Sequence, residues 1–156
     1  MTENTRMNEE QMAEKINAAF PEGITSIAIS PRRIFMTINK DILLKLCNAL
    51  KDEFGFEHVS CVCGVDMKTH FQTVYHISSY SNKVVAEIVV DNIPRDKPEV
   101  DSIAPLWGGA NWHERETYDM YGIIFKGHPK MERILLQDDF GFFPLRKDYD
   151  VGRRVA

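Results

Sequence analysis

The sequence predicts an α+β fold: a two-layer sandwich of a mixed five-stranded sheet with helices on one face, followed by an extended C-terminal arm. Five short segments have the composition and period-two alternation of strands, and two segments repeat apolar residues at helical spacing. Runs of strands broken by a few helices are typical of α+β proteins. The last stretch is dense in Gly, Pro and Arg and has few periodic apolar positions. We therefore expect a disordered N-terminus (1–7), a domain (8–125) and an arm (126–156).

The first part of the domain predicts a helix, two strands and a second helix. Asn8 can cap a helix that runs through Phe20, where Pro21 stops it. Strands are expected at 24–30 and 34–38, and the second helix at 39–54 with Gly55 at its left-handed end. The apolar stripes of the two helices comprise Met12, Ile16, Ala19 and Phe20, and Ile42, Leu43, Leu46, Leu50 and Phe54.

Three more strands are expected at 58–66, 71–79 and 83–91. The last is Val-rich on both faces, so we expect it in the centre of the sheet. In the first, Cys61 and Cys63 fall at every second position between Val59 and Val65 and so share their face, which predicts that both thiols face the core. After a polar linker, Pro98 is suited to begin a short helix that ends near Pro105.

A third helix is predicted from Trp112 to Tyr121. Asn111 is a suitable N-cap, Glu114 can reach back to it as in a capping box, and Gly122 suits the left-handed end. Trp112, Glu116 and Asp119 are expected to share one face of this helix. Residues 123–125 then predict a short extended piece that leads into the arm.

Composition excludes several classes of function. A chain of 156 residues suits one domain, and its net charge of -4 argues against nucleic-acid binding. No apolar run approaches the roughly 18 residues of a membrane span, and the polar N-terminus does not resemble a secretory signal. Three cysteines, Cys47, Cys61 and Cys63, suggest free thiols in a reducing compartment.

Two kinds of chemistry remain open from the residues alone. The helix carboxylates Glu114, Glu116 and Asp119, with His113, are candidates for a metal site or a free-standing enzyme. A second helix with matching ligands is missing, so ion pairing with Arg115 and Arg133 is the favoured interpretation.

The three cysteines are the candidates for an independent iron–sulfur electron carrier. A cluster held by four cysteines cannot be built from three, which favours a structural interpretation. Gly108-Gly109 lacks a third glycine and a preceding strand, so a nucleotide site is not expected.

Three motifs in the last third carry a specific family resemblance. They are Trp112-x-Glu-Arg-Glu-x-Tyr-Asp-Met-Tyr-Gly-Ile123, Phe125-x-Gly-His-Pro-x-Met-x-Arg-Ile-Leu135 and Pro144-Leu-Arg-Lys-Asp-Tyr149. Together they resemble the C subunit of the proton-pumping NADH:quinone oxidoreductase, respiratory complex I. The family includes relatives in the F420H2 dehydrogenases of methanogens and in membrane-bound nickel–iron hydrogenases. Where the family has Gly-His before the last motif, this chain has Phe142-Phe143, so no histidine role carries over there.

The resemblance implies a non-catalytic structural subunit. It implies no cofactor in this chain, with iron–sulfur clusters and flavin in partner subunits. The partners would be the hydrogenase-like large subunit (the D subunit), which the chain would clamp, and the cluster-bearing B subunit, with the membrane arm contacted indirectly. Arg146, Lys147 and Asp148 would form inter-subunit ion pairs. The implied interface residues are Trp112, Glu114, Arg115, Glu116, Tyr118, Asp119, Tyr121, Gly122, Phe125, Gly127, His128, Pro129, Arg133, Pro144, Leu145, Arg146, Lys147, Asp148 and Tyr149.

The resemblance also implies a location and a set of complexes. The chain would lie at the cytoplasmic face of the cell membrane, held there through the complex. Its short length favours an F420H2 dehydrogenase with methanophenazine as acceptor. A bacterial or photosynthetic NADH:quinone oxidoreductase and a membrane-bound hydrogenase are the alternatives.

Overall fold

The computed structural model describes residues 6–150 and contains a mixed five-stranded sheet covered by helices, as the sequence predicts. The strand order is β1-β2-β5-β4-β3, in which β2 and β5 are parallel and the other neighbours antiparallel. A separate parallel pair joins β6 and β7. The bounds are α1 Glu9–Ala19, β1 Ile24–Ser30, β2 Arg33–Ile38, a 3-10 turn Lys40–Ile42, α2 Leu43–Asp52, β3 His58–Asp66, β4 Phe71–Ser79, β5 Val84–Ile93, β6 Glu99–Asp101, α3 Ala110–Tyr121 and β7 Ile124–Lys126.

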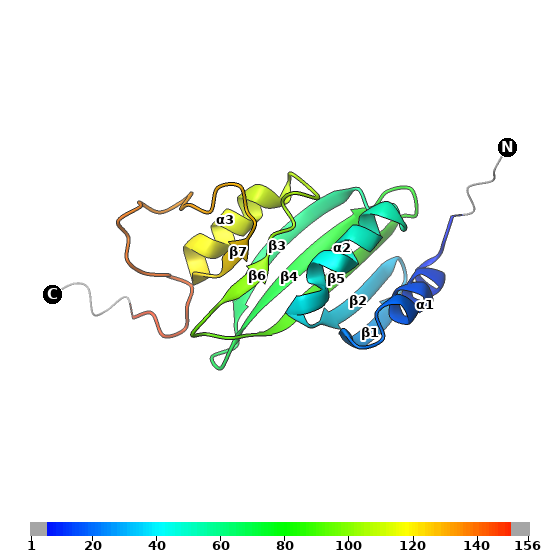
Figure 1. Cartoon of the computed structure of the whole chain (residues 1–156), viewed down its shortest axis with the longest axis horizontal. Coiled ribbons are helices and arrows are strands. Elements are labelled where there is room, and N and C mark those ends of the chain that lie inside the picture. Colours follow the sequence, from blue (N-terminus) through cyan, green and yellow to red (C-terminus); the bar gives the residue numbers. More distant parts are fainter. Residues whose placement is uncertain (1–5, 151–156) are drawn as a thin grey trace.

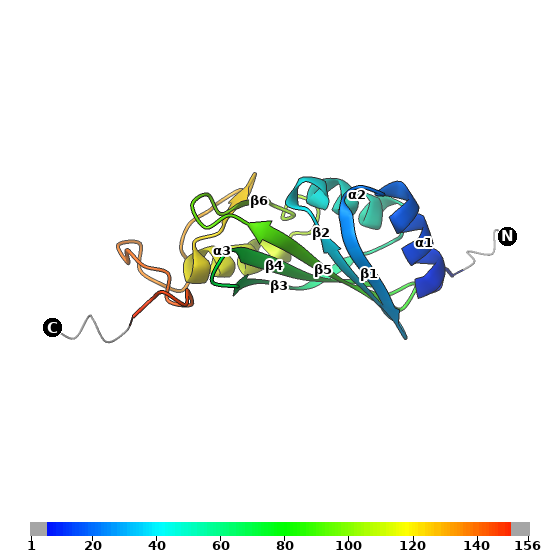
Figure 2. The same ribbon diagram turned by 90° about the horizontal axis from the view of Figure 1, so that it is seen from below.

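The helices are distributed along the sheet from one edge to the other. In Figure 1, α2 lies across the middle of the sheet, while α1 packs beside β1 and α3 beside β3. Figure 2 shows α2 and the sheet as two layers. The arm continues past α3, at the end of the molecule opposite α1 (Figure 1). The domain therefore offers α3 and one edge of the sheet to the arm.

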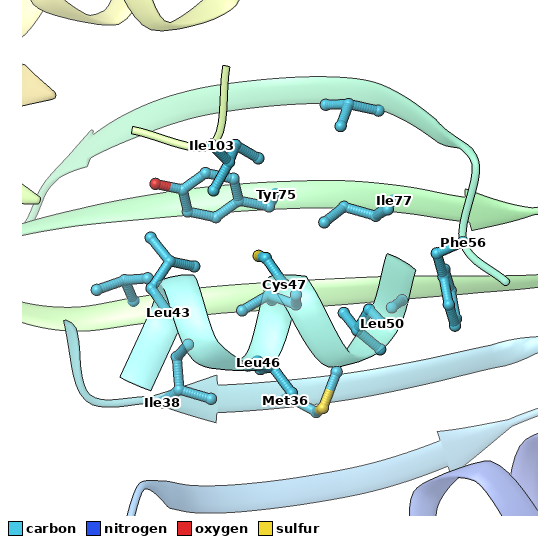
Figure 3. Packing of buried hydrophobic residues seen from close by; sticks show 14 of the residues in the cluster. Met36, Ile38, Leu43, Leu46, Cys47, Leu50, Phe56, Tyr75, Ile77 and Ile103 are labelled. Atoms are coloured by element: carbon cyan, nitrogen blue, oxygen red, sulfur yellow. The ribbon is translucent and has the colours of Figure 1, made fainter. Parts of the chain in front are cut away.

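The core lies between α2 and the sheet. Leu43, Leu46 and Leu50 of α2 are fully buried against β2 and β4, with Cys47 among them (Figure 3). Tyr75 of β4 is fully buried as well. The predicted alternation is confirmed in β2, β4 and β5, whose inward residues are Ile34, Met36 and Ile38; Phe71, Thr73, Tyr75 and Ile77; and Val84, Ala86, Ile88 and Val90. The predicted central position of β5 is also confirmed.

The first two helices agree with the sequence except at single positions. Asn8 caps α1 in a capping box, because its Oδ1 accepts the Gln11 N–H (2.8 Å) and the Gln11 side chain accepts the Asn8 N–H (3.2 Å). Ala19 is exposed, contrary to the predicted stripe, and Ala13 is buried instead. The second helix ends at Asp52, two residues early, and Gly55 is left-handed as expected (φ 67°).

The prediction that Cys61 and Cys63 face the core is wrong. A β-bulge between Val59 and Cys61 places one extra residue in β3, which reverses the alternation beyond it. Val62 is consequently buried, while Cys61 is half-buried and Cys63 exposed.

The predicted helix after Pro98 is also wrong. Residues Glu99–Asp101 form β6, in which Val100 pairs with Phe125 of β7. Both side chains are buried, so pairing with a strand that follows α3 overrides the local helix signal of Pro98.

The segments predicted for the two ends of the chain lie partly outside the described residues. Of the predicted disordered segment 1–7, residues 1–5 lie outside; Arg6 and Met7 hydrogen-bond to Asn82. Of the predicted arm, residues 151–156 lie outside. Residues 127–150 contain no helix or strand.

Candidate subunit interface

Helix α3 ends where the sequence predicts but begins differently. Gly122 is left-handed (φ 76°), and a Cβ there would lie 2.6 Å from Nη2 of Arg146 and 2.7 Å from the Phe143 ring. Glycine is therefore required by both the backbone and the packing of the arm. At the start, the predicted Asn111 cap is wrong, because Gly109 is the N-cap and no side chain caps the helix.

Glu114 turns into the protein instead of back to the helix start. Its side chain is fully buried and accepts hydrogen bonds from Ser102 Oγ (2.5 Å) and the Ile103 N–H (2.8 Å). Burial raises the pKa of Glu114 to about 7, against the lowering effect of these hydrogen bonds. Glu114 thus ties α3 to the segment that follows β6.

His128 connects the root of the arm to α3. Its side chain is buried, its Nε2 lies 3.1 Å from the Asn111 carbonyl oxygen, and Glu114 Oε2 is 3.9 Å away. Nδ1 accepts the Lys130 N–H (2.9 Å), so the proton resides on Nε2, which donates to Asn111. Gly127 before it is left-handed (φ 83°). The Gly-His-Pro turn therefore fixes the direction in which the arm leaves β7.

Asp119 is the main anchor of the arm. The carboxylate is fully buried, pairs with Arg133 (Nη1–Oδ1 2.7 Å), and its Oδ2 accepts the N–H groups of Ile134, Leu135 and Leu136 at 3.2, 2.7 and 3.0 Å. Burial alone would raise its pKa, but Arg133 and the three N–H donors outweigh burial, so the pKa of Asp119 lies below its usual value. Asp119 is therefore held as a charged, fully bonded carboxylate.

Two arginines bind backbone carbonyl groups of the arm, Arg115 from α3 and Arg133 from within the arm. Arg133 donates from Nη2 to the carbonyl oxygens of Phe140 and Phe142. Arg115 donates to the carbonyl oxygens of Glu132 (3.1 Å) and Arg133 (3.0 Å). The predicted pairing of Arg133 with a helix carboxylate is present, whereas Arg115 binds backbone.

The last motif packs on the end of α3 and the edge of the sheet. Arg146 Nε donates to the Tyr121 carbonyl (2.6 Å), and its guanidinium lies 4.6 Å from the centre of the Phe143 ring and 5.1 Å from that of Phe71. The N–H of Leu145 donates to the carbonyl of Met120 (3.1 Å). Arg146 therefore fills the space between the arm and the domain.

Asp66 and Arg95 belong to this contact although the sequence did not single them out. Asp66 at the end of β3 is buried; it pairs with Arg95 (2.5 Å) and accepts the Lys147 N–H (2.8 Å). Arg95 also lies 3.4 Å from Asp148. No signal pointed to Asp66, because the predicted alternation placed it on the outer face of its strand and its partners are distant in sequence.

The remaining predicted interface residues divide into exposed and packed groups. Trp112 and Leu145 are exposed, at 62% and 53%, as are two neighbours in the arm, Leu135 (63%) and Phe142 (47%). A hollow of about 520 Å³ lies among Gly141, Phe142, Phe143, Arg146, Asp148, Tyr149 and Asp150. Glu116, Gly127, Pro129, Lys147 and Asp148 are also exposed, whereas Tyr118, Tyr121, Pro144 and Tyr149 are half-buried and Phe125 is buried.

The helix carboxylates do not gather into one site. Glu116 is exposed, while Glu114 and Asp119 are buried and bind different partners. Trp112, Glu116 and Asp119 all lie on α3 at the predicted helical spacing, but the arm covers only Asp119. Within residues 6–150, no three His, Cys, Asp or Glu side chains come together in a way that could hold a metal ion. Cys47 lies in the core on α2, whereas Cys61 and Cys63 lie on β3.

Comparison with known proteins identifies relatives over most of the chain. Residues 36–155 match the family described as the 30 kDa subunit of the respiratory-chain NADH dehydrogenase. The C subunit of the F420H2 dehydrogenase of Methanosarcina mazei is 41% identical over 148 residues, which cover 92% of this chain and 93% of that protein. The C subunit of the NADH-quinone oxidoreductase of a Roseiflexus species is 38% identical over 146 residues, 89% of this chain and 82% of that protein.

Two solved structures share the fold. A trypsin-resistant fragment of Nqo5 superimposes with a TM-score of 0.68 at 25% identity, over 80% of this chain and 99% of the fragment. A chain of the archaeal membrane-bound sulfane sulfur reductase, a respiratory membrane complex, gives a TM-score of 0.79 at 24% identity, over 92% of this chain and 86% of that chain. The second likeness concerns the fold alone.

Proposed function

The chain belongs to the family of 30 kDa subunits of the respiratory-chain NADH dehydrogenase, and we propose that it is a structural subunit of a complex I-like membrane oxidoreductase. In this role it positions a partner subunit and carries out no chemistry itself. The observation that carries the proposal is the arm. Its backbone is bonded to α3 at Leu135 and Leu145 and to Arg133 at Phe142, while these three apolar side chains remain exposed. Exposed apolar side chains on a fixed backbone are typical of a protein–protein interface.

The partner we propose is the hydrogenase-like large subunit, with the cluster-bearing B subunit next to it. The chain would clamp the large subunit, which lines the quinone or methanophenazine site. Iron–sulfur clusters and flavin would then belong to partner subunits. Small displacements impair sites of this kind, so a rigid clamp is functionally useful.

We propose an F420H2 dehydrogenase as the host complex. The support is the Methanosarcina mazei relative, which is 41% identical and matches over 93% of its length. The alternatives are a bacterial or photosynthetic NADH:quinone oxidoreductase, supported by the Roseiflexus relative, and a membrane-bound hydrogenase. No helix among residues 6–150 has the length and apolarity to cross a membrane. We propose that the chain is peripheral, at the cytoplasmic face, and reaches the membrane through its partners.

The test is native purification from the source membrane through a tag on this chain, followed by mass spectrometry of the proteins that accompany it. We expect hydrogenase-like large and small subunits together with antiporter-like membrane subunits. The input subunit identifies the donor: an F420-oxidising flavoprotein or an NADH-oxidising module. Recovery of the chain alone, particularly with bound iron and a visible absorption spectrum, would refute the proposal and support an electron carrier that uses its cysteines.

A further inference from the structure

The two cysteines of β3 lie on the outer face of the sheet, opposite the core. Beyond the bulge, Cys61, Val62 and Cys63 pair in regular register with β4, and Val62 between them faces the core. Cys61 is half-buried and Cys63 is exposed, so solutes can reach this pair. The third cysteine, Cys47, is fully buried on α2 (Figure 3).

The thiols of Cys61 and Cys63 interact with each other, but their spacing does not suit a disulfide. Side chains two positions apart on a strand leave the same face with Cβ atoms roughly 6.5 Å apart, whereas a disulfide needs about 3.5–4.5 Å. The Cys61 thiol still acts directly on that of Cys63. A metal ion can bridge the pair, because two metal–sulfur bonds of about 2.3 Å, the zinc value, hold sulfur atoms up to about 4.6 Å apart.

Two carboxylates contribute negative charge around this pair. Glu87 of β5 and Glu116 of α3 both act electrostatically on Cys63. Glu87 also lies 3.6 Å from Nε2 of His76, the residue of β4 that stands opposite Cys61. Negative surroundings favour a bound cation. Because no set of three His, Cys, Asp or Glu ligands forms among residues 6–150, the pair offers two sulfur donors and no complete site for an ion that needs more.

We propose that Cys61 and Cys63 form a two-coordinate site for a soft, thiophilic metal ion, and that Cu(I) is the ion it fits best. Thiolate sulfur selects Cu(I) over hard ions such as Mg²⁺, and Zn²⁺ in structural sites takes four ligands. Cu(I) displaces one proton from each thiol, so two protons are released and the copper bis-thiolate carries a single negative charge. The site is independent of the proposed function, because no partner subunit takes part in it.

The first test is an anaerobic competition for Cu(I) between the reduced full chain and bicinchoninate, whose Cu(I) complex is coloured. The unaltered chain should remove one Cu(I) ion per chain. Cys61→Ser and Cys63→Ser should each weaken Cu(I) binding at least about a hundredfold, since even residues behind the ligands are worth about 10–100-fold in metal affinity. Cys47→Ala is the matched control: its thiol is fully buried, so the affinity should stay unchanged. Circular dichroism checks that each variant folds.

The second test identifies the ligands directly. The copper X-ray absorption spectrum of the loaded chain should contain sulfur as its only nearest neighbours, and an equal amount of Zn²⁺ should not displace the copper. Nitrogen or oxygen neighbours in place of sulfur would overturn the assignment of the two thiols as ligands.

Three other results would overturn the inference. Retention of all Cu(I) by bicinchoninate, or equal uptake by Cys63→Ser, would remove the site. Loss of two hydrogens from the peptide that holds Cys61 and Cys63 after treatment with glutathione disulfide, as mass spectrometry can detect, would assign the pair to a disulfide. Dimerisation by Cu(I) that Cys63→Ser abolishes would place the ion between two chains. None of these results bears on the proposed structural role.

Discussion

Replacement of Glu114 by glutamine should make the protein more stable at neutral pH and change little in acid. The side chain is fully buried, and burial raises its pKa from 4.5 to about 7. The folded state therefore prefers the protonated acid, and ionisation costs stability. Glutamine has nearly the same shape, remains neutral at every pH, and can keep the contacts with Ser102 Oγ and the Ile103 N–H.

The expected magnitude follows from the difference between the two pKa values. A raised folded-state pKa gives a stabilisation that is complete below about 4.5 and is lost as the pH rises to about 7. A difference of about 2.5 pKa units corresponds to about 3 kcal/mol of unfolding free energy. The unfolding free energy of Glu114→Gln should thus equal that of the unaltered chain near pH 4 and exceed it by about 3 kcal/mol above pH 7.5.

The assay is urea unfolding of both proteins between pH 4.5 and 8. With an m-value of about 2 kcal/mol per molar urea, the two midpoints should separate by about 1.5 M at the alkaline end. Carboxylates whose pKa is lowered, such as Asp66 and Asp119, shift both curves alike and cancel in the comparison. Glu116→Gln is the matched control, because Glu116 is exposed on the same helix. If the difference in unfolding free energy between Glu114→Gln and the unaltered chain stays the same from pH 4.5 to 8, the argument is refuted.

Three further predictions concern the arm and the open edge of the sheet. Gly122→Ala should destabilise the free chain by about 1–2 kcal/mol or more, because it forces a left-handed backbone on alanine and a Cβ against Arg146 and Phe143; an unchanged urea midpoint would contradict this. Arg146→Ala should reduce the amount of assembled complex on native gels while the free chain keeps its circular dichroism, and truncation before Pro144 should reduce assembly further; full assembly in both would count against the clamp. Partial desolvation of the thiol by its surroundings, together with the neighbouring Cys61, raises the pKa of Cys63 to about 11. Its alkylation should therefore be slow at pH 8 and increase towards pH 10, as mass spectrometry of the modified chain can show.

The sequence alone determined most of the elements, β6 excepted, and the family of this protein. The strands β2, β4 and β5 follow from alternation that each segment carries within itself, and the end of α3 follows from Gly122. The three motifs of the last third likewise indicated the family, because their order and spacing can be seen without a structure. Signals of this kind are local, so they do not depend on which distant segments the fold brings together.

Only the tertiary structure decided where the charged groups of those motifs are used. Glu114 could cap its own helix according to the sequence, yet Ser102 and Ile103 bind it in the interior. Asp66 accepts the N–H of Lys147 across 81 positions of the chain, and the bulge in β3 turns Cys63 outward. These outcomes depend on which segments the topology brings together, and a hydrogen bond between distant residues leaves no periodic pattern in either of them. The motif residues therefore identify the arm, and the fold determines that its charges bind the domain while its apolar side chains face outward.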